Sequence, residues 1–346
     1  MASSVLELPT FKGRPGWEFT DISGLDLDNY ELVAVHPAAG SDAPGSLWDL
    51  PAAALPAGVE VSFSEGEAVV TVARGVIVEQ PIALSTVVPD GKLANTRTRV
   101  VIEEGAQAEV WEQYVSAGDC VLNVATELTV GEGAILRYVC GQALSEEAWI
   151  FGAQNATVDR SGRLDWVALG FGSRSGHVLM QTRLIGEGAD ARVTGAYATH
   201  GSQHIDFDTT QEHAAEHTTS DLAFRGVLQD RSTAVWKGNI IVDPGAQKTD
   251  AFQDSRNLLI SKRAHADSIP GLEIQANDVR CTHAAAVAQV DPEQLFYLRS
   301  HGLPEAEAKQ LVIEGFLAAL VERFEAGPVR DVLARALEQR LALILG

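Results

Sequence analysis

Apolar and polar residues alternate along the middle of the chain, from about Gln80 to Val290. The segments RVVIE at residues 99–103 and LDWVA at residues 164–168 interleave Val, Ile, Leu and Trp with charged residues. Proline is scarce throughout this region. Because successive side chains of a strand point to opposite faces, a period of two is typical of half-buried β-strands. The pattern therefore predicts a mostly β core.

Turn signals interrupt this alternation at a nearly fixed interval. The glycines of EEGA, GEGA, RSGR, GEGA and DPGA are separated by 28, 29, 26 and 57 residues, and the last gap equals two intervals of about 28. They are Gly105, Gly133, Gly162, Gly188 and Gly245. Such a unit has no room for a crossover helix of roughly ten residues. The period predicts a stacked β architecture, but it does not separate a β-helix from a meander or a propeller.

The pattern changes to helices after Asp291. An N-cap and an N1 proline, Asp291 and Pro292, precede EQLFYLRS; Pro304 precedes EAEAKQLVIEGFLAALVERF, and Pro328 precedes VRDVLARALEQRLALIL. The first 80 residues mix short apolar pieces with loop chemistry such as HPAAGSDAPGS. We therefore divide the chain into an N-terminal region (1–80), a β core (81–290) and a helical domain (291–346).

The middle helix carries an apolar stripe at three- and four-residue spacing. The stripe consists of Leu311, Val312, Phe316, Leu320 and Phe324. We expect it to pack on the end of the β stack as a cap, because stacked repeats need capped ends. A docking face for a partner is the alternative, and the two roles can use different sides of the helices.

Composition narrows the classes of function. The 346 residues carry a formal charge of −21, so we expect neither nucleic acid nor an anionic membrane surface as a partner. A secretory signal and an apolar run of membrane-spanning length are both missing from the sequence. Three widely spaced cysteines, Cys120, Cys140 and Cys281, form no disulfide framework. These features predict a cytoplasmic protein. No GxxxxGK[ST] motif occurs, so ATP hydrolysis by this chain is not expected.

Two other groups of residues suggest a site of their own. Four histidines form two pairs at i, i+4, which places both rings of a pair on one face: His200, His204, His213 and His217. Without an HEXXH motif we expect them to be histidines of the stack rather than a metal site. The carboxylate pairs Asp206/Asp208 and Asp243/Asp250 would suit a β-helical carbohydrate-active enzyme. This enzyme is an alternative hypothesis, but no aromatic residues that could stack on a sugar accompany these carboxylates in the sequence.

The segment NDVRCTHAAAVAQVD places a cysteine and a histidine two positions apart, at Cys281 and His283. On a strand both side chains point to one face, roughly 6 to 7 Å apart, within reach of one ion but too far for a direct hydrogen bond. A tetrahedral iron or zinc site needs four ligands. The pair is therefore either buried filler or half of a site that another chain completes.

The segment from Gly238 to Phe316 resembles the core of the SufB/SufD family of iron–sulfur cluster assembly proteins. The resemblance rests on GNIIVDPGAQKTDAFQDSRNLLIS, IPGLEIQANDVRCTHAAAV and DPEQLFYLRSHGLPEAEAKQLVIEGF. HTTSDLAFRGVL and GVIVEQPI are more weakly similar, and KGRPGWEFTDISGLDL is similar to the N-terminal segment of D-type subunits. The resemblance implies a right-handed parallel β-helix core, a small N-terminal region and a C-terminal helical segment.

Within the family the chain resembles the D-type subunit. Ser255 stands about where the B-type subunit has its sulfur-accepting cysteine, and CTHA resembles the D-type CSHG. On that match, His283 corresponds to the D-type histidine implicated in nascent cluster assembly, with Cys281 beside it. Ala284, Ala285 and Ala288 depart from the common GATVG pattern. Because alanine disfavours positive φ, the two Gly-to-Ala changes bear on the local backbone geometry.

The resemblance implies a non-enzymatic scaffold of the SUF assembly complex. Its partners would be a B-type homologue and an ABC-type ATPase that docks on the C-terminal helices. A transient iron–sulfur cluster would be shared with the B-type partner, with His283 and Cys281 as the cluster-binding residues. His283 is the expected metal ligand, because a free imidazole with a pKa near 6.5 is neutral at cellular pH whereas an unperturbed thiol is mostly protonated. A B-type or homodimeric member of the family is the alternative.

Overall fold

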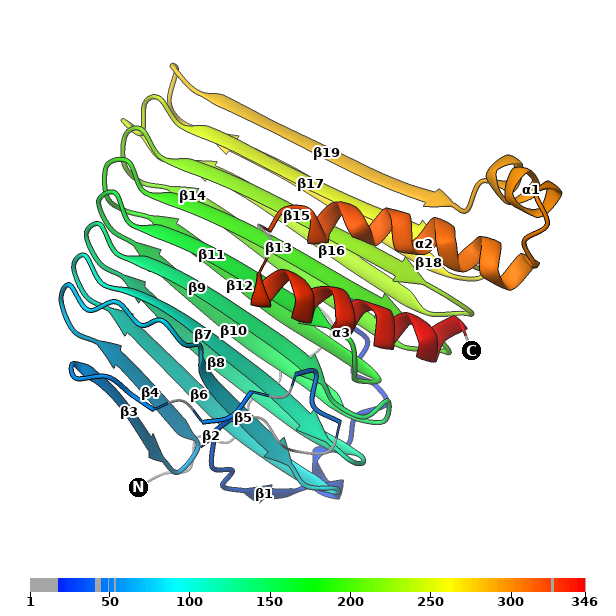
Figure 1. Ribbon diagram of the computed structural model, residues 1–346, viewed down its shortest axis with the longest axis horizontal. Coiled ribbons are helices and arrows are strands. Elements are labelled where there is room, and N and C mark those ends of the chain that lie inside the picture. The colour runs from blue at the N-terminus through cyan, green and yellow to red at the C-terminus, as the bar shows by residue number, and fades with distance from the viewer. Residues whose placement is uncertain (1–17, 41–44, 49, 53, 325–326, 346) are drawn as a thin grey trace.

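Two long β-sheets form the body of the protein (Figure 1). The computed structural model describes residues 18–40, 45–48, 50–52, 54–324 and 327–345. The first sheet runs in the order β18-β16-β14-β12-β10-β8-β6-β4-β3, with β1 beside β6, and the second in the order β19-β17-β15-β13-β11-β9-β7-β5-β2. Because the chain alternates between the two sheets from β4 onward, it winds as a β-solenoid of about eight turns. The predicted β-helix core is confirmed.

The strands from β5 onward have similar lengths of 7 to 11 residues, whereas β1 to β4 are shorter. The first sheet contains β1 (Glu31–Val33), β3 (Val59–Ser64), β4 (Glu67–Val72), β6 (Lys92–Ile102), β8 (Cys120–Val130), β10 (Trp149–Val158), β12 (Ser175–Leu184), β14 (His204–His213), β16 (Thr233–Val242) and β18 (His265–Ile274). The second contains β2 (Ala38–Ala39), β5 (Ile82–Val88), β7 (Gln107–Ser116), β9 (Ile135–Ala143), β11 (Arg163–Gly170), β13 (Asp190–Thr199), β15 (Thr219–Leu228), β17 (Asp250–Leu259) and β19 (Arg280–Gln289). All described pairs are parallel except β3–β4 and β2–β5. Strands β3 and β4 thus extend the first sheet into the N-terminal region.

The repeated turns lie above one another along one edge of the solenoid. In each turn a residue with positive φ donates its backbone N–H to a carbonyl of the next turn. These residues are Gly75, Gly105, Gly133, Ser161, Gly188, His217 and Lys248. His217, with φ of 58°, occupies the turn that falls inside the 57-residue gap between glycines. The predicted period is therefore continuous, although a histidine replaces glycine at that turn.

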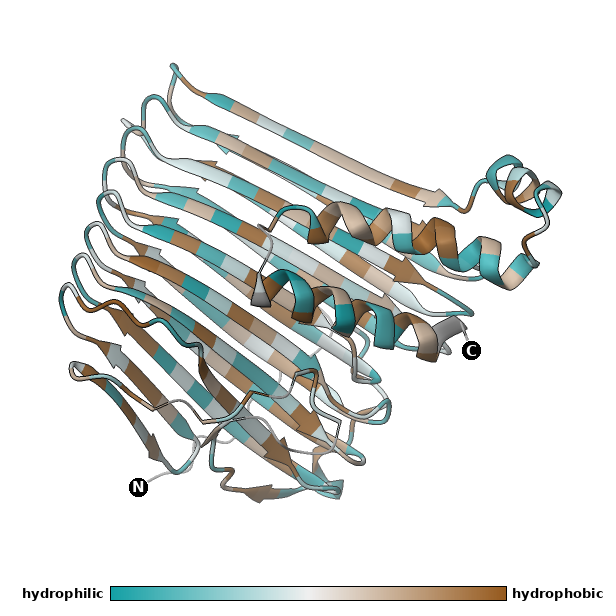
Figure 2. Cartoon of the chain, viewed as in Figure 1, coloured by the Kyte–Doolittle hydropathy of each residue, from teal (hydrophilic) through white to brown (hydrophobic). Residues whose placement is uncertain are grey.

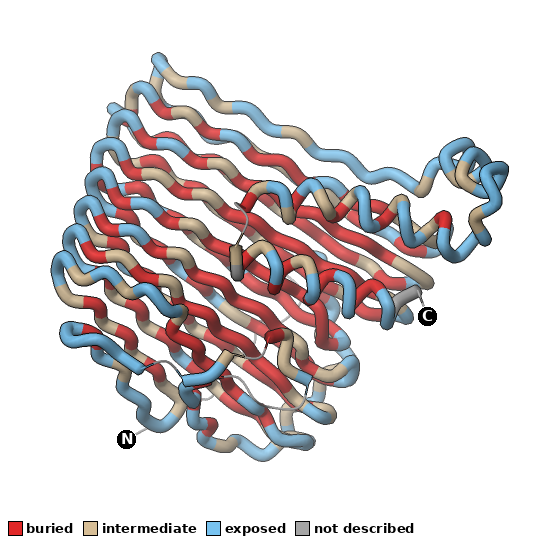
Figure 3. Tube along the Cα trace, viewed as in Figure 1, coloured by how far each residue is buried: buried red, intermediate tan, exposed pale blue. Residues whose placement is uncertain are grey.

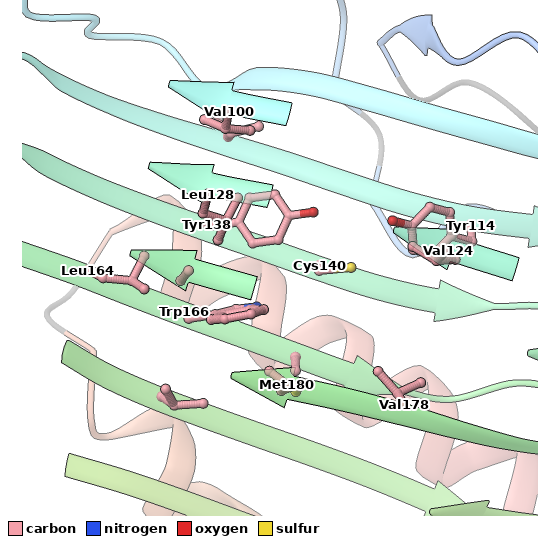
Figure 4. Packing of buried hydrophobic residues seen from close by; sticks show 14 of the residues in the cluster. Val100, Tyr114, Val124, Leu128, Tyr138, Cys140, Leu164, Trp166, Val178 and Met180 are labelled. Atoms are coloured by element: carbon pink, nitrogen blue, oxygen red, sulfur yellow. The ribbon is translucent and has the colours of Figure 1, made fainter. Parts of the chain in front are cut away.

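The interior of the solenoid is apolar but contains polar groups. Figure 2 shows the alternating hydropathy along the strands, and Figure 4 shows Tyr138, Cys140 and Trp166 packed between the sheets. Glu112 is fully buried there and accepts hydrogen bonds from Thr98 Oγ1 and from the hydroxyl of Tyr138. Burial raises the pKa of Glu112, and it raises that of the Cys140 thiol to about 12. Cys140 is therefore protonated at neutral pH.

Three helices follow the last strand, as predicted: α1 (Pro292–Ser300), α2 (Glu305–Val321) and α3 (Pro328–Leu345). The Asp291 side chain accepts a hydrogen bond from the backbone N–H of Glu293 and caps α1. Helices α2 and α3 lie across the outer face of the second sheet, where they pack on β15 and β13 (Figure 1). None of the described helices is long and apolar enough to span a membrane.

The prediction that the α2 stripe caps the end of the stack is wrong. The buried side of α2 consists of Ala308, Ile313, Leu317 and Leu320. Of the predicted stripe, Leu320 and Phe324 are buried, whereas Val312 and Phe316 are half-buried and Leu311 is 49% exposed. Apolar residues surround most of α2, so periodicity did not identify the side that packs on the sheet.

The N-terminal segment crosses the outer face of the first sheet. Ile22, Leu25, Leu27 and Tyr30 pack against a small apolar cluster that includes Trp149. The Thr20 hydroxyl donates to Asp206 Oδ2 at 2.7 Å and is buried. The segment includes a short 3-10 helix, η1 (Leu27–Asn29). The first part of the KGRPGWEFTDISGLDL resemblance, residues 12–17, lies outside the described residues.

Candidate functional site

The last turn of the solenoid leaves its end open. Among the described strands, β19 pairs only with β17 and β18 only with β16, so each has one unpaired edge. Figure 3 shows β19 as almost entirely exposed or half-buried, in contrast to the buried strands beneath it. Ile274 is 42% exposed and Val287 is also 42% exposed. An apolar interior and two free strand edges together form a surface suited to another chain.

Cys281 and His283 lie on the inner column of β19 at this end. In the parallel register, Cys281 follows Ala251 and His283 follows Gln253, and both residues of β17 are buried in the interior. His283 is exposed because no strand follows β19. This register is consistent with the expectation that the side chains of Cys281 and His283 point to the same face of β19. Neither residue completes a metal site in the described part of the chain, where no three metal-ligating side chains come together.

Cys281 has an environment unsuited to forming a thiolate. It is half-buried and packs against an apolar cluster that includes Ile240, Val242 and Ala251. Partial burial raises the pKa of the Cys281 thiol, and the carboxylate of Asp250 adds to this increase. A higher pKa leaves less thiolate at neutral pH, and the thiolate is the form that binds iron.

A polar layer lies directly beneath the open end. The Tyr197 hydroxyl donates to Asn257 Oδ1, Asn257 Nδ2 donates to Ser268 Oγ at 3.0 Å, and Ser268 Oγ lies 3.2 Å from Ser255 Oγ. Ser255 faces the interior and is fully buried. Gln253 belongs to the same layer. The end of the solenoid thus has a hydrogen-bonded floor below His283 and its neighbours.

The three alanines after His283 that depart from the common GATVG pattern fit the strand. Ala284, Ala285 and Ala288 all lie within β19, and none of them is among the described residues with positive φ. An extended backbone accepts alanine without strain. The substitutions therefore leave His283 on a regular strand.

The other predicted groups do not assemble into a site. His204 and His213 lie at opposite ends of β14, where His204 Nδ1 lies 2.7 Å from Thr233 Oγ1 and His213 contacts two hydroxyls. His200 and His217 are in separate turns. The carboxylates of three of the four aspartates are engaged elsewhere: Asp206 with His177, Asp208 with Lys237, and Asp250 with Arg280. This arrangement does not provide a pair of free carboxylates facing one substrate.

A second exposed surface lies between α1 and α2. It is a groove of about 750 Å³ whose lining includes Tyr297, Leu298, Leu311, Val312 and Phe316. The side chains of Tyr297 and Leu311 are 62% and 49% exposed, and Phe296 beside the groove is 74% exposed. Leu258 of β17 also lines this groove, so the groove lies beside the outer face of the second sheet.

Comparison with known proteins identifies the family. Residues 86–316 match the family model described as "SUF system FeS cluster assembly, SufBD core domain". The chain belongs to the SufBD family. A SufBD family protein of Mycobacterium bovis is 31% identical over 79% of this chain and 71% of its own. The SufD proteins of Bacillus subtilis and Escherichia coli are 30% and 29% identical, over 92% and 93% of this chain and 68% and 81% of their own. The D-type resemblance is confirmed.

Sequence reasoning missed two parts of this candidate site. It did not single out Gln253, although the period places Gln253 directly beneath His283 on the preceding turn of the second sheet. It also did not find the α1–α2 groove, because the exposed side of α2 became clear only when the helix was placed on the sheet. A strand register derived from the turn spacing could have identified Gln253. No local sequence pattern predicts the α1–α2 groove.

Proposed function

We propose that this SufD-like chain is the non-ATPase scaffold of a SUF iron–sulfur cluster assembly complex. In this proposal the open end of the solenoid pairs with a B-type homologue, and His283 supplies a ligand to the nascent cluster, which is the cargo of the complex. The single observation that supports it most is the position of His283 on an exposed inner column with two unpaired strand edges beside it. Half a site at an open edge needs a second chain to complete it.

His283 is the ligand and Cys281 its neighbour in this proposal. A neutral imidazole binds iron through a ring nitrogen without losing a proton. The raised pKa of Cys281 makes the thiol the weaker candidate. The chain itself needs no catalytic residue, so we propose a scaffold rather than an enzyme. The negative charge of −21 supports protein partners rather than nucleic acid.

An ABC-type ATPase is the second proposed partner, and its docking surface is the α1–α2 groove. The exposed Phe296, Tyr297 and Leu311 provide apolar anchors of the type that dominates protein interfaces. Helix α2 lines this groove and also packs on the second sheet. In this proposal, a movement of the bound ATPase is therefore transmitted through α2 to the solenoid. We retain the division into residues 1–80, 81–290 and 291–346, and a cytoplasmic location, as parts of this proposal.

Anaerobic co-purification tests the proposal. The tagged chain is co-expressed with a B-type homologue and an ABC-type ATPase of the SUF system, and the complex is analysed by size, subunit content, iron and acid-labile sulfide. We expect a ternary complex that carries iron and sulfide. A chain that captures neither partner, or that remains a homodimer when both are present, would contradict the proposal.

A further inference from the structure

Ser268 lies on β18, the last strand of the first sheet, and belongs to the inner column of the open end. In the parallel register it follows Trp236, which is fully buried in the interior. Ser268 itself is half-buried, because no described strand pairs with the outer edge of β18. Its Oγ lies 3.0 Å from Asn257 Nδ2 and 3.2 Å from Ser255 Oγ, both on the turn below. In the described part of the chain the Ser268 hydroxyl has no other hydrogen-bond partner.

The orientation of the Asn257 amide is determined by Tyr197. The Tyr197 hydroxyl is fully buried, and among the described residues it donates only to Asn257 Oδ1. A buried hydroxyl needs an acceptor, so the amide oxygen must face Tyr197 and the NH₂ group must face Ser268. A Cβ on Gly226 would lie 2.1 Å from Asn257 Oδ1 and 2.2 Å from the Tyr197 ring. The glycine thus leaves the space that this tyrosine–asparagine pair occupies.

Ser268 accepts two hydrogen bonds in this layer. Ser255 is fully buried, and Ser268 Oγ is the hydrogen-bond partner that the described residues offer to its hydroxyl. Because a buried donor needs an acceptor, Ser255 donates to Ser268. The two bonds, from Asn257 and Ser255, use both lone pairs of the Ser268 oxygen. On β19 the residues paired with these two donors are Ala285 and Val287, whose side chains accept no hydrogen bond. The proton of Ser268 is therefore left for a group beyond the last turn.

We propose that Ser268 determines which side chain a partner presents to the open end. Its hydroxyl donates to a side-chain oxygen on the partner strand that pairs with β18. An inner residue of that strand lies about 4.8 Å from Ser268 and faces the same way. Backbone carbonyls lie in the plane of the sheet, so the acceptor is the side chain of Asn, Gln, Asp or Glu. An apolar residue there would leave the Ser268 donor buried and unpaired, which disfavours the wrong partner. The inference rests on the proposed pairing with a B-type homologue.

The affinity of the chain for the B-type homologue, measured by titration calorimetry, tests this role. Ser268→Ala removes the hydroxyl, whereas Ser268→Thr retains it. We expect Ser268→Ala to raise the Kd about 10-fold, because the acceptor on the partner becomes buried without a donor. Ser268→Thr should stay within about 3-fold of the wild type.

Tyr197→Phe tests whether the buried layer orients Ser268. Without the tyrosine hydroxyl, the amide of Asn257 is free to turn its oxygen towards Ser268, which then donates inward. We expect the Kd for the B-type homologue to rise about 5-fold, with no further increase when Tyr197→Phe is added to Ser268→Ala. Tyr138→Phe is the matched control, because it removes an equally buried hydroxyl, bonded to Glu112, from a distant turn. It should leave the affinity unchanged.

Three results would overturn the inference. They are a wild-type affinity in Ser268→Ala, an affinity in Ser268→Thr as low as in Ser268→Ala, and additive losses in the double variant with Tyr197→Phe. A wild-type chain that binds no B-type homologue contradicts the proposed function instead, so the two failures are distinct.

Discussion

His213 lies at the end of β14 inside the solenoid, where its Nδ1 and Nε2 atoms lie 2.8 Å and 2.9 Å from the hydroxyls of Thr218 and Ser220. Burial lowers the pKa of His213 to about 4. The unfolded chain binds a proton at His213 below a pH of about 6.5, and the folded chain does not until about 4. The free energy of unfolding therefore falls as the pH decreases between these values.

We predict that His213 contributes roughly 3 kcal/mol to this loss of stability between pH 6.5 and 4. Urea unfolding of the wild type and of His213→Gln at several pH values measures it. The variant should lose less stability over this window. His265→Gln, at an imidazole that is 67% exposed in its side chain, is the control and should retain the wild-type slope. Equal slopes in wild type and His213→Gln contradict the prediction.

Glu112 makes the free energy of unfolding depend on pH in the opposite direction. Burial raises the pKa of Glu112 above its usual value of about 4.5, so the folded chain keeps the proton at a pH where the unfolded chain has lost it. Stability therefore decreases as the pH rises from about 4.5 towards the folded pKa. Glu112→Gln, which retains polar contacts for Thr98 and Tyr138, should remove this decrease. A Gln variant whose stability declines with pH as steeply as the wild type would contradict the account.

Helix α2 presents two sides with different roles. Leu317 is 2% exposed on the side that packs on the second sheet, whereas Leu311 is 49% exposed beside the α1–α2 groove. Periodicity predicted the three helices and their boundaries closely, because capping residues such as Asp291 and the prolines determine where each begins. It did not predict the packed side, because a helix that is apolar on most sides has no unique stripe.

Leu317→Ala should destabilise the chain by about 2 to 5 kcal/mol, because it leaves a cavity between α2 and the sheet. Leu343→Ala, at a side chain of α3 that is 70% exposed, should change stability by less than about 0.5 kcal/mol. Chemical denaturation followed by circular dichroism measures both. Equal effects would mean that α2 does not pack as described.

The two proposed docking surfaces can be separated by substitution. Val287→Glu places a charge on the apolar open end and should abolish capture of the B-type homologue while the ATPase still binds. Leu311→Glu should do the reverse at the α1–α2 groove. Pull-down of each partner with each variant measures this double dissociation. Loss of both partners in both variants, with stability unchanged, would show that the surfaces are not independent.

At the scale of the whole molecule, turn spacing predicted the stack and the family resemblance predicted its type. At some turns a polar residue with positive φ, such as His217, takes the place of glycine. The spacing of glycines alone therefore skipped the turn between Gly188 and Gly245. The position of His283 above Gln253 depends on the register of distant turns, which local patterns do not show. The open end could not be inferred either, because a strand without a neighbour has the same sequence pattern as one within the sheet.

The central claim is that His283 at the open end binds the nascent cluster. The most direct test is the iron and sulfide content of the complex reconstituted anaerobically with the B-type homologue and the ATPase, for wild type, His283→Ala and His265→Ala. His265 is an exposed imidazole on β18 that lies outside the inner column of β19. We predict that His283→Ala assembles with both partners but loses at least about 10-fold in cluster content, whereas His265→Ala equals the wild type. A His283→Ala complex with wild-type iron and sulfide would contradict the claim.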